Sequence, residues 1–302
     1  MVSSTTEENM DQKTLDFTIV DVFARRLFEG NQLAVVRTDQ KLTSDQMMEI
    51  TREFGYSETT FIGKSDPIDR PVKVRIFGLT GEMSFAGHPS LGTAYVLTKG
   101  KDADALTLVL GKGSVKIRIE KSGHNRLFEM DQGNPEFLGD HCKKDVASAL
   151  GVNPDVLDPQ LPVEAVSTGN SFITVPFRNL QDLSRIRINK DTAQEYLKLH
   201  NAMHFYLVTR ETVYPDTKLH CRMIYEKGED PATGSAAGPA AAYMLKHHLM
   251  ESGEQVWIEQ GIEIMRPSML RVTGDVIRGS VENIKVAGAC FEAGTGKLSI
   301  PD

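Results

Sequence analysis

The sequence has few cysteines and lacks the long apolar runs of a secreted or membrane-spanning protein. Its three cysteines, Cys142, Cys221 and Cys290, lie far apart and form no Cys-x-x-Cys pair. Such usage is typical of a reducing compartment rather than of a disulfide framework. Apolar runs such as residues 240–245 are too short to span a bilayer, and the polar, acidic start has no secretory signal core. We therefore expect a cytoplasmic protein with no membrane partner.

Basic charge is also scarce, which bears on the class of partner. The 34 Lys and Arg residues are outnumbered by 41 Asp and Glu residues, giving a net charge of -7, and no long basic run occurs. Nucleic-acid binding normally requires a basic patch or stripe, so we expect no nucleic-acid partner. A length of 302 residues suits two domains, and residues 1–13 are expected to form a disordered tail.

Short strand-like segments dominate the chain and alternate with a few helices. Apolar residues at 72, 74 and 76 alternate with Lys73 and Arg75, as in a half-buried strand. Strands are expected at residues 17–23, 33–36, 72–76, 106–110, 115–119, 163–166, 172–175, 205–208, 256–259 and 284–289. Helices are expected at residues 44–54, 89–99, 143–150, 191–200 and 235–251. Thr43 and Gln46 predict a capping box at the first helix.

Two of these helices, residues 89–99 and 235–251, are rich in Ala and Gly in their first turns. A helix that is small or apolar on every side is a buried one, so each is expected to be a central helix wrapped by a sheet. Two glycine-containing stretches, residues 111–113 and 294–297, are expected to be turns. The second lacks the glycine spacing and the Ser or Thr of a phosphate-binding loop.

The two halves of the chain repeat the same features in the same order. Residues 30–36, which begin Gly-Asn, resemble residues 169–175. The turns at 86–89 and 233–236 then each lead into a helix containing Ala-Tyr-x-Leu. The ordered set indicates two copies of one fold, joined near residues 127–135.

Glu58 is a candidate acid/base because it lies between aromatic and β-branched residues, in Tyr56-Ser57-Glu58-Thr59. Such surroundings can desolvate a carboxylate and raise its pKa toward the range where proton transfer is efficient. The alternative is a solvated glutamate in a helix–strand turn, because most glutamates are exposed.

The matched helix starts are candidate anion sites. Gly87 and Gly234 each open a helix, whose free N–H groups and dipole favour a carboxylate. The alternative is a pair of ordinary helix starts. His88 and Asp230 belong to the same two turns and could meet across a cleft, although a structural histidine and a helix-dipole aspartate are common.

Motifs for metals and cofactors are weak. His200 and His204 are four apart on an expected helix, but Asn201 stands where a metalloprotease motif needs Glu. No dinucleotide-binding fingerprint occurs. We expect neither a metal nor a cofactor.

Several short motifs stand out together: Asp21-Val22-Phe23, Gly30-Asn31, Ser57-Glu58-Thr59, Gly81-Glu82-Met83, Ala86-Gly87-His88-Pro89, residues 229–236 (Glu-Asp-Pro-Ala-Thr-Gly-Ser-Ala) and Arg266-Pro267-Ser268. With these motifs the chain resembles the phenazine-biosynthesis isomerase (PhzF-like) family, over residues from about 17 to the C-terminus. The resemblance implies an α+β, diaminopimelate epimerase-like fold with two pseudo-symmetric lobes. Each lobe would be a curved, mostly antiparallel sheet around a central helix. The expected lobes are residues 14–128 and 129–302, with a last strand that could return to the first lobe.

The resemblance also implies roles for individual residues. Glu58 would transfer the proton on a small carboxylate-bearing substrate, without a cofactor. The expected pocket residues are His88, Asp230, Ser235, Gly87, Gly234 and Asn31. The first three would bind the substrate and help set protonation states, the two glycines would offer backbone N–H groups to its carboxylate, and Asn31 would line the pocket. A homodimer is the expected assembly.

The expected reaction depends on which side chains could act as bases. Epimerases related to this family place a cysteine in each matched turn, whereas Ala86 and Thr233 stand there in this chain. Stereoinversion by two thiols is therefore disfavoured, and a one-base isomerase that shifts a double bond is expected. The alternatives are a racemase or epimerase using Glu58 with His88 or Asp230, and a non-catalytic binding protein. Residues 77–80 and 224–228 depart from the family pattern, so the substrate stays open.

Overall fold

The chain adopts a mixed α/β fold with few helices. The computed structural model describes residues 13–64, 68–122, 125–226 and 228–300, so residues 1–12 of the expected tail lie outside it. The strands of this described part are linked into one 18-stranded sheet. Its helices are α1 (Ser44–Phe54), α2 (Gly87–Thr98), α3 (Lys143–Leu150), η1 (Pro154–Val156), α4 (Leu180–Ser184), α5 (Lys190–Leu199) and α6 (Gly234–Lys246).

The strands are mostly antiparallel, with parallel pairs at β2–β3, β4–β7, β12–β13 and β14–β16. Their bounds are β1 (Thr14–Val22), β2 (Asn31–Arg37), β3 (Glu58–Ile62), β4 (Val72–Lys73), β5 (Arg75–Gly78), β6 (Gly81–Met83), β7 (Ala105–Leu110), β8 (Gly113–Ser122), β9 (Asn125–Asp131), β10 (Glu136–His141), β11 (Val163–Ser167), β12 (Ser171–Pro176), β13 (His204–Thr209), β14 (Thr217–Tyr225), β15 (Gly228–Asp230), β16 (Val256–Gln260), β17 (Ser268–Ile277) and β18 (Ser280–Ser299).

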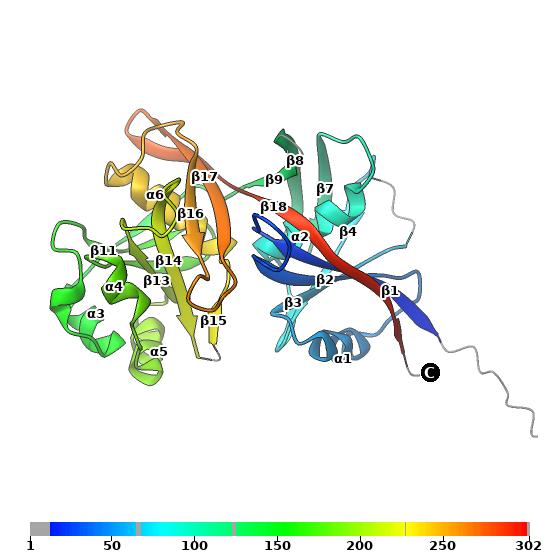
Figure 1. Cartoon of the computed structure of the whole chain (residues 1–302), viewed down its shortest axis with the longest axis horizontal. Helices are drawn as coiled ribbons and strands as arrows, with labels where there is room; N and C mark the ends of the chain where they lie inside the picture. Colours follow the sequence, from blue (N-terminus) through cyan, green and yellow to red (C-terminus); the bar gives the residue numbers. More distant parts are fainter. Residues whose placement is uncertain (1–12, 65–67, 123–124, 227, 301–302) are drawn as a thin grey trace, which may run out of the picture.

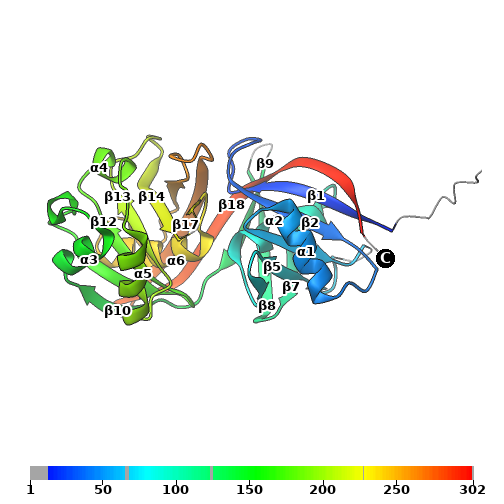
Figure 2. The same ribbon diagram turned by 90° about the horizontal axis from the view of Figure 1, so that it is seen from below.

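The elements gather in two groups along the long axis of the molecule (Figure 1). Residues 14–131, called the first half below, form one group, and residues 136–277, called the second half, form the other. Strand β18 extends from one group to the other in both views (Figures 1 and 2). It pairs with β17 through Ala287, with β9 up to Ala289, and with β1 from Cys290 onward. One strand therefore connects the two halves by backbone hydrogen bonds.

Helices α2 and α6 are buried on nearly every side. Every residue of α2 is buried except Tyr95, and every residue of α6 is buried except Ser235 and Lys246. Both helices contact strands of their own half and also β18, and their apolar residues belong to one core cluster. Small side chains allow this close packing, because a Cβ on Gly92 would come within 2.6 Å of the Leu33 side chain.

Local sequence signals predicted the bounds of two helices correctly. Helix α1 begins and ends as expected, and Thr43 and Gln46 form the expected capping box. Gly55 then ends it in the left-handed conformation, with φ of 66°. Helix α3 also matches its expected range.

The expected end of α6 and the expected turn at residues 294–297 are wrong. Helix α6 ends at Lys246 rather than at residue 251, because His247 caps it and His248 takes a left-handed φ of 56°. Residues 294–297 are not a turn but part of β18, paired with residues 16–19 of β1. The glycines there make room for the partner strand, since a Cβ on Gly296 would come within 2.6 Å of the Phe17 ring.

Candidate active site

Glu58 is the first residue of β3, four residues after the end of α1. Its side chain is 16% exposed. Burial, together with the negative charge of Asp230, raises the pKa of Glu58 to about 8, although a hydrogen bond from Ser57 opposes the shift. A carboxyl group with this pKa is mostly protonated at neutral pH, yet it can lose its proton to a substrate and regain it.

His88, the second residue of α2, faces Glu58. Its Nε2 atom lies 3.4 Å from the Glu58 Oε2 atom. Burial lowers the pKa of His88 to about 3, so the ring is neutral and the contact is not an ion pair at neutral pH. Both of these atoms are buried and have no hydrogen-bond partner within the described part of the chain. Orphaned polar atoms are costly in a protein interior, so the pair is suited to receive polar groups of a ligand.

Asp230 ends strand β15 in the second half and approaches the same place. Its carboxylate accepts hydrogen bonds from Thr233 Oγ1 at 2.6 Å and from Asn31 Nδ2 at 2.8 Å. Burial raises the pKa of Asp230 to about 6, and these two hydrogen bonds limit the rise. Asp230 is therefore mostly ionised at pH 7, whereas Glu58 is mostly protonated.

Asn31 joins the residues of the two halves. Its amide nitrogen also donates to the Ala232 carbonyl at 3.1 Å and lies 3.4 Å from His88 Nδ1. Gly30 sets its position, because a φ of 76° and the Val22 carbonyl, 2.3 Å from where a Cβ would lie, require glycine. Glu58, His88, Asp230 and Asn31, all expected at the site, thus lie together.

The starts of α2 and α6 meet beside this cluster. A Cβ on Gly87 would lie 3.7 Å from the Gly234 Cα atom, so glycine at both positions permits the close approach. Neither helix has a side-chain cap: Ala86 cannot form one, and the Thr233 hydroxyl donates to Asp230 instead. The first N–H groups of both helices are thus left without a capping acceptor.

Ser235, in contrast, lines a cavity with Lys112, Gln132, Thr168 and Asn170, and no hydrogen bond links it to Glu58, His88 or Asp230. Ser235 directly follows Gly234 at the start of α6, and its place in the pocket stays a prediction.

Gln260 is a residue of the site that sequence reasoning missed. It is fully buried at the end of β16, and its Nε2 atom donates to the Asp230 carbonyl at 2.7 Å and to Thr233 Oγ1 at 2.9 Å. Its Oε1 atom accepts from Tyr206 OH at 2.9 Å. The available signal was a polar residue, followed by glycine, at the end of an apolar strand.

A comparison with known protein families shows to which family this chain belongs. A family profile described as "Phenazine biosynthesis-like protein" matches residues 20–294. The chain belongs to this family. Trans-2,3-dihydro-3-hydroxyanthranilate isomerase of Pseudomonas chlororaphis is 30% identical over 296 residues, covering 93% of this chain and 98% of that relative. An uncharacterized isomerase of Mesorhizobium japonicum is 33% identical, covering 95% of this chain and all of the relative.

Solved structures agree with this membership. A PhzF-family phenazine biosynthesis protein of Bacillus anthracis superposes with a TM-score of 0.85 at 26% identity, covering 95% of this chain and 100% of that one. Relatives of the phenazine biosynthesis-like family are named isomerases, and this family member is an isomerase.

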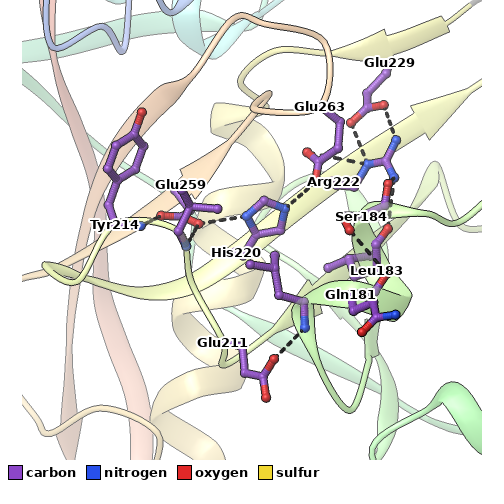
Figure 3. Close-up of polar contacts among 12 residues, drawn as sticks. Gln181, Leu183, Ser184, Glu211, Tyr214, His220, Arg222, Glu229, Glu259 and Glu263 are labelled. Atoms are coloured by element: carbon purple, nitrogen blue, oxygen red, sulfur yellow. Dashed lines mark hydrogen bonds and ion pairs between the residues drawn. The ribbon is translucent and has the colours of Figure 1, made fainter.

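A buried charge network in this phenazine biosynthesis-like protein includes Arg222 and Glu229 (Figure 3). Arg222 on β14 pairs with both oxygens of Glu229 on β15, at 2.9 and 2.6 Å, and donates to the carbonyls of Leu183 and Ser184. Because Glu229 immediately precedes Asp230, these bonds hold the short β14–β15 hairpin that carries the site carboxylate.

His220 extends the network toward the segment after β16. It lies between Glu259 and Glu263, with ring nitrogens 2.8 and 2.9 Å from their carboxylates (Figure 3). Burial alone would lower the pKa of His220, but the hydrogen bonds to the two glutamates raise it to about 9. The charged imidazolium therefore offsets part of the negative charge of the two carboxylates at neutral pH.

Metal-site geometry is absent from the residues that the structure describes, where no group of three or more His, Cys, Asp or Glu side chains is arranged to hold an ion. His200 caps α5 and His204 begins β13, so this pair does not share a helix as expected. No helix within the described ranges has the length and apolar character needed to cross a membrane.

Proposed function

We propose that this isomerase shifts a proton between carbon atoms of a small carboxylate substrate, with Glu58 as its general acid/base. The observation that carries the proposal is the buried, unpartnered Glu58 Oε2 atom, whose carboxyl has a pKa near 8 and faces the unpartnered His88 Nε2 atom. A base with a pKa near the working pH combines a sufficient ionised fraction with sufficient basicity.

The surrounding groups suit the other parts of such a substrate. The free N–H groups at the starts of α2 and α6 would bind its carboxylate. Asp230, ionised at pH 7, would repel that carboxylate and accept hydrogen bonds from an amino or hydroxyl group. Neutral His88 would orient a polar group beside Glu58. The name trans-2,3-dihydro-3-hydroxyanthranilate, given to the substrate of one relative, describes a carboxylate with amino and hydroxyl groups, so we take this compound as the first candidate.

The same proposal includes the finer architecture. Residues 14–128 and 129–302 would be pseudo-symmetric lobes, each with a curved sheet around α2 or α6. The repeated turns and the all-round burial of both helices support this division. We also propose that the chain forms a homodimer, which light scattering during size-exclusion chromatography tests.

Proton NMR of purified protein with candidate substrates in D2O tests the function. Incubation with trans-2,3-dihydro-3-hydroxyanthranilate is expected to move a double bond, with loss of the C–H signal at one carbon and a new C–D or C–H bond at another. Single amino and hydroxy acids form the second arm, in which falling optical rotation would identify a racemase instead. Tight binding without any change in the ligand would identify a non-catalytic member. Either of these outcomes contradicts the proposal.

The charge of Asp230 is expected to set part of the pKa of Glu58. The Asp230→Asn variant removes a negative charge that disfavours ionised Glu58, so the pKa of Glu58 is expected to fall below its value near 8. The low-pH limb of kcat/KM should move to lower pH, since the ionised base persists there. The pKa of Glu58 can also be measured without turnover, by NMR titration of protein labelled with 13C-glutamate. The Glu58 signal is identified as the one that is missing from the spectrum of a Glu58→Gln variant. The exposed Asp191→Asn control should leave it unchanged, and an unshifted pKa in Asp230→Asn would disprove the coupling.

A further inference from the structure

The loop after β1 and the segment before β17 join the two halves by backbone hydrogen bonds. The Gly30 N–H donates to the Pro267 carbonyl at 2.9 Å, and the Met269 N–H donates to the Phe23 carbonyl at 2.7 Å. In Figure 1 the blue loop after β1 faces the orange segment before β17 at the centre of the molecule. Asn31 directly follows this loop, so contacts from the second half fix the chain immediately before it.

Arg266 is the side chain that joins the same two segments. Its Nε atom donates to the Gly30 carbonyl at 2.9 Å, and its Nη2 atom donates to the Glu29 carbonyl at 2.8 Å. The Nη2 atom also donates to Asp21 Oδ1 at 2.7 Å. A single guanidinium of the second half therefore binds two successive carbonyls and one carboxylate of the first half, which its planar, rigid fork of donors permits.

Asp21, on β1, anchors the guanidinium from the opposite side. Its side chain is 1% exposed, and that of Arg266 is 18% exposed. The other carboxylate oxygen, Oδ2, accepts from the Phe28 N–H at 2.8 Å, so both oxygens of Asp21 have partners. A buried ion pair is often no more stabilising than apolar side chains of the same size. What this pair adds is a fixed direction for each of its hydrogen bonds.

The carbonyl that Arg266 Nε holds belongs to the peptide that joins Gly30 to Asn31. Because a peptide is planar, fixing its carbonyl also fixes the nitrogen of Asn31. The Asn31 amide donates to Asp230 Oδ1 at 2.8 Å and to the Ala232 carbonyl at 3.1 Å. Hydrogen bonds weaken steeply as their angle departs from linearity, so a turned peptide would weaken both contacts.

We propose that Arg266 is a positioning residue of this isomerase: its guanidinium, anchored by Asp21, holds the peptide before Asn31 so that the Asn31 amide reaches Asp230. Arg266 acts through Asn31, since no hydrogen bond or ion pair joins it to Asp230 or Glu58 within the described ranges. Its consequence for turnover rests on the function proposed above. Its effect on Asn31 and Asp230 requires no substrate.

The pKa of Asp230 gives a direct measure of this positioning. Burial raises this pKa to about 6, and the hydrogen bond from Asn31 opposes the rise, so release of Asn31 should raise it further. Arg266→Lys keeps a positive charge beside Asp21 but lacks the fork that binds both carbonyls. NMR titration of protein labelled with 13C-aspartate measures the pKa. The Asp230 signal is the one that is missing from the spectrum of Asp230→Asn.

Arg37→Lys is the matched control. Arg37 ends the strand that Asn31 begins, and its Nη2 atom donates to the Val96 carbonyl at 2.7 Å, entirely within the first half. This variant should leave the pKa of Asp230 unchanged. Asn31→Ala should give the full rise. Adding Arg266→Lys to Asn31→Ala should raise the pKa no further, because both substitutions break the same hydrogen bond.

Turnover provides a second measurement. With the substrate of the proposed function, Arg266→Lys is expected to lower kcat/KM by about tenfold or more, because a misplacement of roughly 1 Å at a site can cost about a hundredfold. Arg37→Lys should be close to wild type. If the wild type isomerises no candidate substrate, the proposed function fails, while the titrations still decide the role of Arg266.

Failure of Arg266→Lys to fold would not prevent the test. Asp21→Asn removes the charge that anchors the guanidinium but keeps an oxygen for the Phe28 N–H. Loss of a negative charge would by itself lower the pKa of Asp230, so a rise in this variant can come only from release of Asn31.

A higher pKa of Asp230 in Arg266→Lys or Asp21→Asn, absent in Arg37→Lys and not additive with Asn31→Ala, supports the proposal. An unchanged pKa of Asp230 in the folded variant would overturn it. Full additivity with Asn31→Ala would overturn it as well, because Arg266 would then act by a route that does not include Asn31.

Discussion

Glu58→Gln is expected to lower kcat by about a thousandfold or more, because a positioned acid/base contributes roughly 10²–10⁴ to the rate and the described site offers no second carboxylate facing His88 Nε2. Glutamine keeps the shape of the side chain and can occupy the same pocket, but it cannot exchange a proton with carbon. Substrate affinity should therefore change much less than kcat. Steady-state kinetics with trans-2,3-dihydro-3-hydroxyanthranilate measures both quantities.

The matched control for this variant is Glu53→Gln, which changes an exposed glutamate on α1 and should retain full activity. Folding is not expected to confound the result. Because the pKa of Glu58 is raised to about 8, the folded state holds an extra proton above the ordinary pKa of 4.5, so stability falls as pH rises between these values. Glu58→Gln removes that loss and should be at least as stable as the wild type at pH 8. Near-normal kcat in a folded variant would contradict the assigned role.

Arg222→Met is expected to reduce the free energy of unfolding by about 3–5 kcal/mol, the usual cost of leaving one member of a buried ion pair uncompensated. Arg222 and Glu229 have side chains that are 7% and 8% exposed, so water cannot replace the lost partner. The variant also loses two hydrogen bonds to main-chain carbonyls, those of Leu183 and Ser184. Chemical denaturation followed by circular dichroism measures the change.

Arg118→Met provides the comparison, because Arg118 pairs with Asp131 at a position where the side chains are 40% and 50% exposed. Exposed pairs contribute at most about 1 kcal/mol, so this variant should be close to wild type. The double variant Arg222→Met, Glu229→Gln should recover part of the loss, since it no longer buries an unpaired charge. Equal effects of Arg222→Met and Arg118→Met would show that the network does not stabilise the β14–β15 hairpin.

Elements with local signals were predictable from sequence. Helix α1 has its capping box at Thr43 and its left-handed Gly55, and both are set by residues within a few positions of each helix end. The starts of α2 and α6 were recognisable because glycine and small residues recur in matched turns. The predicted range of α6 was too long. The left-handed conformation of His248 follows the end of the helix, and no glycine or proline in residues 247–251 signals that end in the sequence.

Long-range pairing was much harder to foresee. Residues 294–297 were predicted to form a turn because glycine normally interrupts strands. In the structure they pair with β1, and the Phe17 ring occupies the space that a side chain at Gly296 would need. Strand β14 was missed because His220 and Arg222 interrupt its apolar pattern. Their partners, Glu259, Glu263 and Glu229, lie 7 to 43 positions away in sequence, so the charges that compensate them are not visible locally.

The residues of the candidate site were likewise predictable only in part. Glu58, His88, Asp230 and Asn31 were singled out from their surroundings and from the family resemblance, and the structure places them in contact. Gln260 was not, because its role depends on reaching Asp230 and Thr233 from another strand. Ser235 was expected in the same pocket; it lines a cavity with Lys112 and Asn170, and its contact with a substrate stays a prediction.

The most direct test of proton transfer by Glu58 is to follow a labelled hydrogen. The substrate would carry deuterium at the carbon from which the proton is removed. We expect the new bond to hydrogen or deuterium at a different carbon, with the original carbon stripped of deuterium, in the wild type and not in Glu58→Gln. A product with solvent hydrogen at the original carbon and inverted configuration would contradict a one-base isomerase.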